Sequence, residues 1–205
     1  MLKKINSLRG REANILGQEK LFKSAVILPL ININNEICVL FEKRAADLLH
    51  QPGEISFPGG KIEPDDISPE RGAIRETCEE LGLQPHNIEV IAPLDIMVSP
   101  FHVIVYPFVA YIDDINNIKA SCDEVEEVFY VPLDYLLGNA PISYKMWLNV
   151  EPEQDFPFEL IPQGKNYPFH KSYIPQLFWQ WHDHVIWGLT ARILNNFLTL
   201  LRSEK

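Results

Sequence analysis

The stretch of sequence that decides the fold runs from Ser68 to Leu83 and reads SPERGAIRETCEELGL. Serine is a preferred N-cap residue, proline suits the first turn of a helix, and glycine often follows the last turn. Ser68, Pro69 and Gly82 occupy these three places. The stretch therefore predicts a helix from Pro69 to Leu81.

The predicted helix has two chemically different faces. At about 100° per residue, one face is apolar and can pack against a sheet; it consists of Ile74, Cys78 and Leu81. The opposite face carries three glutamates within an arc of about 100°: Glu76, Glu79 and Glu80. Three like charges repel one another, and Mg²⁺ binds such oxygen ligands together with water and phosphate groups. The acidic face is therefore either a metal site facing a cleft or a solvated acidic surface.

The segment before the helix adds a second signal. Residues 57–61, FPGGK, carry two glycines where the backbone must turn tightly, so that backbone carbonyls can point at a ligand. Together with the helix, residues 60–83 resemble the Nudix box, which is a glycine, a short acidic spacer and then Arg-Glu-x-x-Glu-Glu-x-Gly. Residues 75–82 read RETCEELG. Two departures from the pattern are Asp66 as the spacer acid and one extra residue in the loop before Pro69.

The resemblance implies a fold and a reaction. The implied fold is α/β, a Nudix-type α/β/α sandwich with a mixed β-sheet, and we expect one domain over residues 1–205. The implied reaction is metal-dependent hydrolysis of a diphosphate linkage with Mg²⁺, or with Mn²⁺ in its place. Glu76, Glu80 and the backbone carbonyl of Gly59 are the implied metal ligands, and Glu79 shares a second ion or bridges through water. Neutralising Glu76 or Glu80 is expected to lower turnover by orders of magnitude with folding intact and, by relieving repulsion, to stabilise the metal-free protein slightly.

The resemblance also implies the remaining roles at the site. Gly60 and Lys61 are expected to contact the substrate. Arg75 is expected to hold Glu79 through a two-point contact, because a guanidinium matches the geometry of a carboxylate. The general base is either Glu79 or a carboxylate near Glu124, where several acidic residues gather.

Upstream, residues 40–60 read LFEKRAADLLHQPGEISFPGG and resemble the signature of coenzyme A pyrophosphatases within the Nudix family. The agreement includes Arg44, which is expected to face a phosphate of the substrate. The chain departs from the signature at Phe41 and Glu42, where Leu and Thr are usual, and at Leu49, where a basic residue is usual. The implied reaction is hydrolysis of coenzyme A or its derivatives to 3′,5′-ADP and 4′-phosphopantetheine or its acylated form.

Two alternatives stay open. The enzyme can act on ADP-ribose or another nucleoside diphosphate derivative. The chain can also be a non-catalytic Nudix-fold module that binds a nucleotide. The presence of all three helix glutamates argues against the second alternative, because metal chemistry is the main reason to keep them.

Hydrophobic patterns predict the other elements. Residues 24–31 and 37–41 are short apolar runs on either side of Asn-Asn-Glu, which predicts a hairpin. Residues 51–66, rich in Gly, Pro and Asp, predict a loop. Three further strands and a second helix are predicted, at 88–97, 103–112, 125–131 and 184 to about 201.

Composition and charge limit the class of protein. The chain has 205 residues, 46% of them hydrophobic, and a formal net charge of −10. This charge argues against nucleic acid as a partner, since Lys and Arg must replace its counterions, and we expect a small-molecule nucleotide instead. The three cysteines have no paired spacing, and no apolar run resembles a signal peptide or a membrane span. We therefore expect a cytoplasmic protein with no membrane contact.

Residues 138–184 are dense in proline and aromatic residues, among them Trp147, Trp179 and Trp181. Such a segment is too apolar to lie exposed in a monomer. It is predicted to cover the protein's own sheet or to lie at the interface of a twofold homodimer. We expect a homodimer with at least part of this segment at the interface. A third use, compatible with both, is a groove for the pantetheine arm or an acyl chain.

Overall fold

The structure is a computed structural model that describes residues 2–113 and 115–203. The chain divides into two units, and each combines two separate stretches of the sequence. Unit 1 contains residues 1–31 and 58–121, and unit 2 contains residues 32–57 and 122–205. The expectation of one domain over residues 1–205 stays a prediction.

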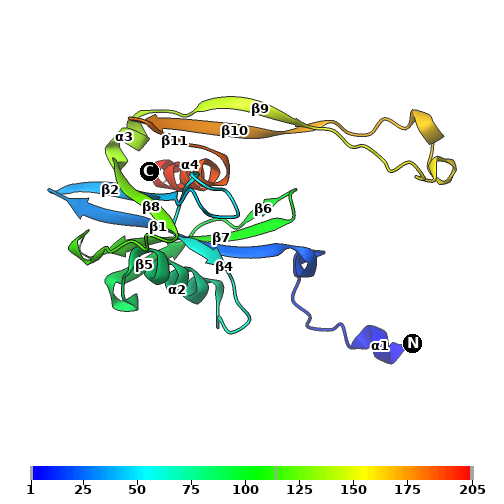
Figure 1. Ribbon diagram of the computed structural model, residues 1–205. Helices are drawn as coiled ribbons and strands as arrows, with labels where there is room; N and C mark the ends of the chain where they lie inside the picture. Colours follow the sequence, from blue (N-terminus) through cyan, green and yellow to red (C-terminus); the bar gives the residue numbers. More distant parts are fainter. Residues whose placement is uncertain (1, 114, 204–205) are drawn as a thin grey trace. The chain divides into compact units, whose positions relative to one another are not determined.

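Unit 1 is built on a mixed sheet (Figure 1). β1 (Phe22–Ile33) runs parallel to β7 (Val103–Ile112), in register from Phe22↔Val103 to Leu30↔Tyr111. Three shorter strands pair antiparallel with these two: β4 (Gly59–Lys61) with β1, and β5 (Ile88–Pro93) and β6 (Met97–Ser99) with β7. Most residues of β1 and β7 are apolar and buried, a pattern typical of strands covered on both faces. The predicted α/β class with a mixed sheet is confirmed.

α2 (Pro69–Leu81) packs against β4 and β7 of this sheet and has the predicted bounds. The Ser68 side chain accepts a hydrogen bond from the N–H of Arg71 at 3.2 Å, and Gly82 ends the helix with φ 64°. Ile74 and Leu81 of the apolar face are buried. Local cap chemistry and periodicity therefore set the helix as predicted.

The end of α2 is tied to a later segment of unit 1. The backbone N–H groups of Lys119 and Ser121 donate to the carbonyls of Leu81 and Glu80, each at 2.8 Å. These bonds satisfy two carbonyls that a helix end would otherwise leave without partners. A Cβ at Gly82 would collide with the carbonyl oxygen of Lys119, so this approach requires glycine.

Unit 2 contains β2 (Glu36–Arg44), which pairs antiparallel with β8 (Val125–Pro132) and with β3 (Ile55–Ser56). α3 (Leu133–Gly138) follows β8 and packs on β2 and β8. Phe41 of β2 stacks between Phe57 and Phe129, with ring centroids 5.0 and 5.5 Å apart. A hairpin was predicted between β1 and β2, and there Asn34 and Asn35 both have positive φ, as the common two-residue hairpin turn requires.

The aromatic segment of unit 2 forms a long two-stranded ribbon. β9 (Ile142–Leu148) pairs antiparallel with β10 (Ser172–Trp181), and β10 pairs with β11 (His184–Ile186). α4 (Gly188–Ser203) packs along β10 (Figure 1). Short helical turns complete the chain: α1 (Leu2–Asn6), η1 (Gln18–Lys20), η2 (Pro85–Asn87), η3 (Ile115–Asn117), η4 (Phe158–Leu160) and η5 (Gly164–Asn166).

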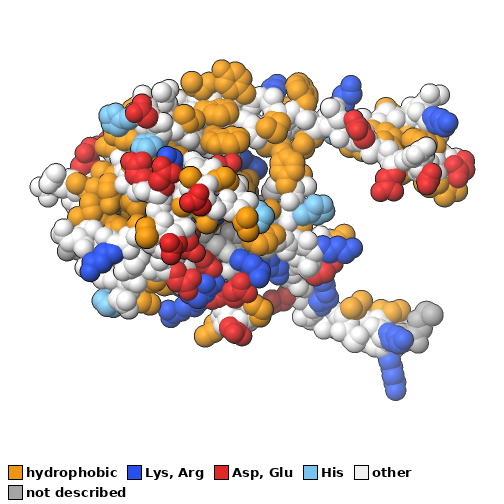
Figure 2. All heavy atoms as spheres, viewed as in Figure 1, with side chains coloured by type: hydrophobic (Ala, Val, Ile, Leu, Met, Phe, Trp, Pro, Cys, Tyr) orange, Lys and Arg blue, Asp and Glu red, His pale blue; other side chains and the backbone are white. Residues whose placement is uncertain are grey.

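The two ends of the ribbon differ in burial. Trp179, near α4, is only 3% exposed and donates its indole N–H to the carbonyl of Asn139 at 2.9 Å. Farther along the ribbon, Tyr144 and Trp147 are 65% and 62% exposed. Trp179 therefore has a packing role at the base of the ribbon. Figure 2 shows the hydrophobic side chains that gather over β9 and β10.

Three predicted boundaries are wrong. Residues 51–66 contain β3 and β4 instead of a continuous loop. The single strand predicted at 88–97 is divided into β5 and β6. The second helix begins at Gly188, because residues 184–186 form β11. Ile186 is fully buried in that strand, and a short apolar run fits a buried strand and a helix equally well.

Across the part of the chain that the structure describes, no helix is both long and apolar enough to cross a membrane.

Candidate active site

Two glutamates of α2 point at the glycines of β4. The backbone N–H of Gly59 donates to Glu80 Oε2 at 2.7 Å, and Glu80 is only 5% exposed. The sequence allowed either a metal site in a cleft or a solvated acidic surface here, and the burial of Glu80 excludes the solvated surface for this residue. The Glu80 side chain is enclosed because α2 packs directly on β4. The hydrogen bond from the Gly59 N–H is charge-assisted and therefore strong, because its acceptor is a carboxylate.

The two glycines permit this close approach. Gly59 has φ 143°, and a Cβ there would collide with the backbone of Ala25 and Val26 on β1. A Cβ on Gly60 would lie 2.5 Å from Glu76 Oε2 and 2.6 Å from its Cδ. Gly59 therefore requires glycine for backbone conformation and strand packing, whereas a side chain at Gly60 would displace the Glu76 carboxylate from its present place.

Arg75 connects three carboxylates of unit 1. Its Nε and Nη2 donate to the two oxygens of Asp66 at 3.2 and 3.1 Å, and Nη2 also donates to the carbonyl of Lys61 at 3.2 Å. Its Nη1 reaches Glu76 Oε1 at 2.8 Å and Glu79 Oε2 at 3.3 Å. The predicted contact between Arg75 and Glu79 exists, but it is a single bond. The two-point partner is Asp66, whose side chain lies closer to the forked Nε–Nη2 edge of the guanidinium.

Asp66 therefore has a defined place. Its side chain is 8% exposed, and besides Arg75 it accepts the backbone N–H of Glu63 at 2.8 Å. The hydrogen bonds from Arg75, with that from Glu63, hold the pKa of Asp66 below its ordinary value. A Cβ on Gly72 would lie 2.9 Å from Asp66 Oδ2, so the helix surface beside the carboxylate must be bare.

Glu79 and Lys61 are the open side chains of this group. The Glu79 side chain is 56% exposed, with the one contact to Arg75 described above. Lys61 Nζ forms an ion pair with Glu63, 3.0 Å from its Oε1, and both side chains are largely exposed. These positions leave both groups accessible to a ligand, and their predicted roles in catalysis and substrate binding stay predictions.

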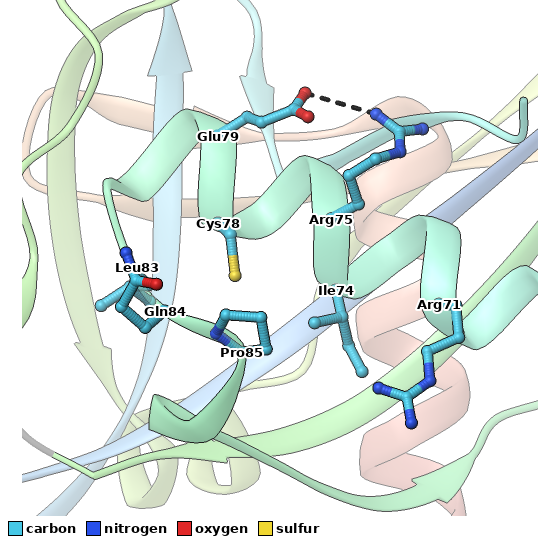
Figure 3. A pocket seen from close by; sticks show the side chains of 8 residues that line it. All are labelled: Arg71, Ile74, Arg75, Cys78, Glu79, Leu83, Gln84 and Pro85. Atoms are coloured by element: carbon cyan, nitrogen blue, oxygen red, sulfur yellow. Dashed lines mark hydrogen bonds and ion pairs between the residues drawn. The ribbon is translucent and has the colours of Figure 1, made fainter. Parts of the chain in front are cut away.

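A shallow pocket lies beside α2 and the turn that follows it (Figure 3). The Cys78 thiol points into it, toward Pro85, while the Arg75–Glu79 ion pair lies at its rim. Its lining consists of Arg71, Ile74, Arg75, Cys78, Glu79, Leu83, Gln84 and Pro85. Burial raises the pKa of the Cys78 thiol, which makes it a poorer nucleophile at neutral pH. Glu76 and Glu80 do not line the pocket, so it is separate from the Gly59–Gly60 contact.

The other predicted site residues, Arg44 and Glu124, belong to unit 2 and are neighbours there. Arg44 pairs with Val125 across β2 and β8, and the N–H of Ala45 donates to the carbonyl of Glu124 at 2.9 Å. The end of β2 thus holds the predicted phosphate-facing arginine next to the predicted base.

Sequence reasoning missed Glu42, which lies two residues before Arg44 on β2. Glu42 is 1% exposed, and Ser56 donates its hydroxyl to Glu42 Oε1 at 2.9 Å. Burial raises the pKa of Glu42 to about 7, against the opposing effects of Ser56 and Arg44. The sequence contained one signal that could have identified Glu42: it departs from the signature of residues 40–60, where threonine is usual at this position.

The side chains of α2 fit a divalent ion in type. Within residues 2–113 and 115–203, no group of three or more His, Cys, Asp or Glu side chains is already arranged around one point that could hold an ion. Mg²⁺ commonly takes only one or two carboxylates and completes its shell with water and substrate phosphates. Glu76 and Glu80, one turn apart, supply such oxygens, and the bare Gly60 leaves the Glu76 carboxylate against the backbone of β4.

Comparisons with known proteins agree with this arrangement. Residues 21–149 match the family model of the NUDIX domain. The chain is 40% identical over 115 residues to the peroxisomal coenzyme A diphosphatase of Mus musculus, an alignment that covers 56% of this chain and 49% of that protein. The chain thus spans about half the length of this relative.

Two further similarities cover more of the chain. The mitochondrial coenzyme A diphosphatase of Mus musculus is 32% identical over 181 residues, covering 87% of this chain and 77% of that protein. The crystal structure of a MutT/nudix family protein from Enterococcus faecalis has the same fold, with a TM-score of 0.54 and 15% identity over 98% of this chain and 70% of that one. From the acidic helix on its glycine strand, the family model and these relatives, we conclude that the chain belongs to the NUDIX domain family.

Proposed function

We propose that this protein hydrolyses the diphosphate linkage of coenzyme A or of a coenzyme A derivative. The products would be 3′,5′-ADP and 4′-phosphopantetheine or its acylated form. The observation that carries the reaction is the approach of the Glu76 and Glu80 carboxylates to the Gly59–Gly60 backbone. Support for the substrate comes from the names of the two mouse relatives and from the resemblance of residues 40–60.

Nudix hydrolases generally need a divalent metal ion. We propose Mg²⁺, with Mn²⁺ as a substitute, held by Glu76, Glu80 and the carbonyl of Gly59, with Glu79 at a second ion or a bridging water. When bound, the ion offsets the charge of the diphosphate and lowers the pKa of water.

The protein residues around the ion position these ligands. The Gly59 N–H holds Glu80, and Arg75 restrains Glu76 and Glu79 through Nη1. Fixed ligands accelerate the reaction because less rearrangement is needed when the substrate arrives. Arg44, Gly60 and Lys61 are the proposed substrate contacts.

The proton of the attacking water needs an acceptor. We propose Glu124 for this role, with Glu79 as the alternative, and the activity of Glu124→Gln distinguishes the two. Water attacks one phosphorus, the bond to the bridging oxygen breaks, and the second phosphate leaves.

A product assay tests the proposed function. The protein is incubated with Mg²⁺ and, in separate reactions, coenzyme A, acetyl-coenzyme A, ADP-ribose or a diadenosine polyphosphate, and the products are separated by ion-exchange chromatography. We expect 3′,5′-ADP from the coenzyme A substrates, at a kcat/KM well above that for ADP-ribose. A higher kcat/KM for ADP-ribose would show that coenzyme A is not the preferred substrate. If the protein bound nucleotides but hydrolysed none of these substrates, it would be a non-catalytic nucleotide-binding module.

We also propose a homodimer that buries the exposed part of the β9–β10 ribbon. An isolated two-stranded ribbon is marginally stable in water, and Tyr144 and Trp147 present large apolar surfaces there. Sedimentation velocity at low micromolar concentration should show a dimer, and Trp147→Ser should shift it toward monomer. A wild-type monomer at these concentrations would contradict this proposal.

We propose the cytoplasm as the compartment. Cys38, Cys78 and Cys122 are all free thiols, as is usual where the medium is reducing. The two mouse relatives are named peroxisomal and mitochondrial, so fractionation of cells that express the protein has three clear outcomes.

A further inference from the structure

β2 carries two buried polar atoms that have no hydrogen-bond partner among the residues described: Glu42 Oε2 and Arg44 Nε. Buried polar atoms are nearly always paired, so an unpaired one requires an explanation. Residues two apart on a strand usually point to the same face. The pairing of β2 with β8 is irregular between Lys43 and Arg44, but the Arg44 charge is close enough to Glu42 to lower the pKa of its carboxyl. One of these atoms accepts hydrogen bonds and the other donates them. The two atoms are therefore chemically complementary, and they lie near each other on β2.

The groups around Glu42 have opposing effects on the pKa of its carboxyl. From β3, Ser56 donates to Oε1 and favours the carboxylate, and Arg44 on β2 does the same through its charge. Glu124, which precedes β8, opposes the carboxylate by repulsion, and the cross-strand neighbour Val128 offers no polar group. Nearby, Lys43 pairs with Glu126, and Glu127 lies 3.5 Å from the Nε2 of His184, so these groups have partners of their own. Both protonation states of Glu42 are therefore populated near neutral pH.

Arg44 has a fixed backbone and an uncommitted side chain. Its N–H donates to the carbonyl of Glu54 at 3.0 Å, and its carbonyl accepts the N–H of Gly53 at 3.1 Å. The guanidinium makes one long contact, from Nη2 to the carbonyl of His50 at 3.4 Å. A guanidinium with five donors and such weak engagement is available to an oxyanion.

We propose that Glu42 is a positioning residue that couples oxyanion binding at Arg44 to the uptake of one proton by the Glu42 carboxyl. An ionised Glu42 competes for Arg44, because Oε2 and the Nε–H are matching partners. An anion on Arg44 removes this attraction and adds a negative charge, so Glu42 binds a proton from solvent. By reciprocity, protonation of Glu42 strengthens anion binding. Identifying the anion as a phosphate of the substrate rests on the proposed function, but the coupling itself does not.

The sign of the pH dependence follows from this coupling. The pKa of Glu42 is about 7 in the free protein and rises when Arg44 holds an anion. Affinity for the anion is therefore highest below pH 7 and falls as the pH rises. Between pH 6 and pH 8 the competent fraction changes from about nine-tenths to about one-tenth, so the Kd should increase by up to about tenfold.

Sulfate is the probe for the test, because it keeps the same charge throughout this pH range. Binding to the full chain is followed by ¹H–¹⁵N NMR of the Arg44 Nε–H between pH 6 and 8, and Glu42 is titrated by ¹³C-carboxyl NMR with and without sulfate. We expect the Kd to rise with pH and the pKa of Glu42 to increase when sulfate is bound. In Glu42→Gln, which keeps the shape but cannot titrate, the Kd should stay within about twofold across the range.

Two further variants keep the test decisive. Arg44→Gln should lose sulfate binding at every pH. Ser56→Ala removes the hydrogen bond that favours the carboxylate, so the pKa of Glu42 and the midpoint of the pH dependence should both move upward. The inference is overturned if Glu42→Gln retains the wild-type pH slope, if wild-type affinity is flat, or if affinity rises with pH. Competition by 3′,5′-ADP separates the two proposals: proton-coupled sulfate binding that 3′,5′-ADP does not displace supports the inference and counts against the coenzyme A substrate.

Discussion

Arg75 and Asp66 form a two-point ion pair, with Nε 3.2 Å from Oδ1 and Nη2 3.1 Å from Oδ2. The same guanidinium reaches Glu76 at 2.8 Å and Glu79 at 3.3 Å, so one side chain connects the loop before α2 to two carboxylates on it. Arg75 therefore holds the carboxylates of Asp66, Glu76 and Glu79 in place. Replacing it by another positively charged residue should still impair the site, because the charge alone does not reproduce these contacts.

Arg75→Lys should reduce kcat strongly. A lysine keeps the charge but cannot make the forked contact with Asp66 while also reaching Glu76. A small misplacement of catalytic ligands can cost about a hundredfold in rate, and we expect a loss of this size with a smaller change in KM. Arg71→Lys, one turn earlier on the same helix, is the matched control and should be close to wild type. Near-normal kcat in Arg75→Lys would exclude the proposed role.

Asp66→Asn should lower the melting temperature in a pH-dependent way. Arg75 lowers the pKa of Asp66 below its ordinary value of 3.8. The ion pair therefore contributes stability that is fully present above the unfolded pKa and is lost as the pH falls through the folded pKa. Melting temperatures of both proteins at pH 7, 5 and 3 should differ most at pH 7 and converge at the acidic end. A constant difference would mean that the charge of Asp66 is unimportant.

Neutralising Glu79 and neutralising Glu80 should have different effects on the stability of the metal-free protein. Glu79 is exposed among like charges, so Glu79→Gln should raise stability slightly or leave it unchanged. Glu80 is buried on the N–H of Gly59, and Glu80→Gln replaces a charge-assisted bond with a neutral one at a cost of about 1 kcal/mol. Urea unfolding with EDTA measures both. Stabilisation by Glu80→Gln would restore the original expectation from clustered charge.

Gly60→Ala should impair turnover more than stability. The added Cβ would lie 2.5 Å from Glu76 Oε2, and the end of a glutamate side chain can move away without unfolding the helix. We expect kcat to fall by about a hundredfold because the carboxylate is displaced from its place. Gly138→Ala, where the Cβ meets nothing within 4 Å, is the control. Equal activity in the two variants would show that the position of Glu76 is not critical.

Glu124→Gln should lower kcat with little change in KM if Glu124 accepts the proton of the attacking water. General base catalysis contributes about 10²- to 10⁴-fold, which sets the expected loss. Glu126→Gln removes a nearby carboxylate that is paired with Lys43 and should leave kcat unchanged. An unchanged kcat in Glu124→Gln would indicate that Glu79, and not Glu124, is the general base.

The sequence alone was sufficient for features that depend on near neighbours in the chain. The bounds of α2, its Ser68 cap and its Gly82 end follow from local hydrogen-bond chemistry and were predicted correctly. Strand β7 has the predicted bounds, since a long apolar run between turn residues has one favourable conformation. The motif of residues 60–83 was enough to indicate the family.

The tertiary structure decided which side chains meet across the chain. Only the packing of α2 on β4 buries Glu80 and places the Glu76 carboxylate against Gly60. The two-point partner of Arg75 is Asp66 instead of Glu79, because the loop folds back along the helix. Likewise, the burial of Glu42 depends on strands that are remote in sequence, β3 and β8. Helical spacing specifies the direction of a side chain from its own axis, but burial and pKa depend on what another segment places there.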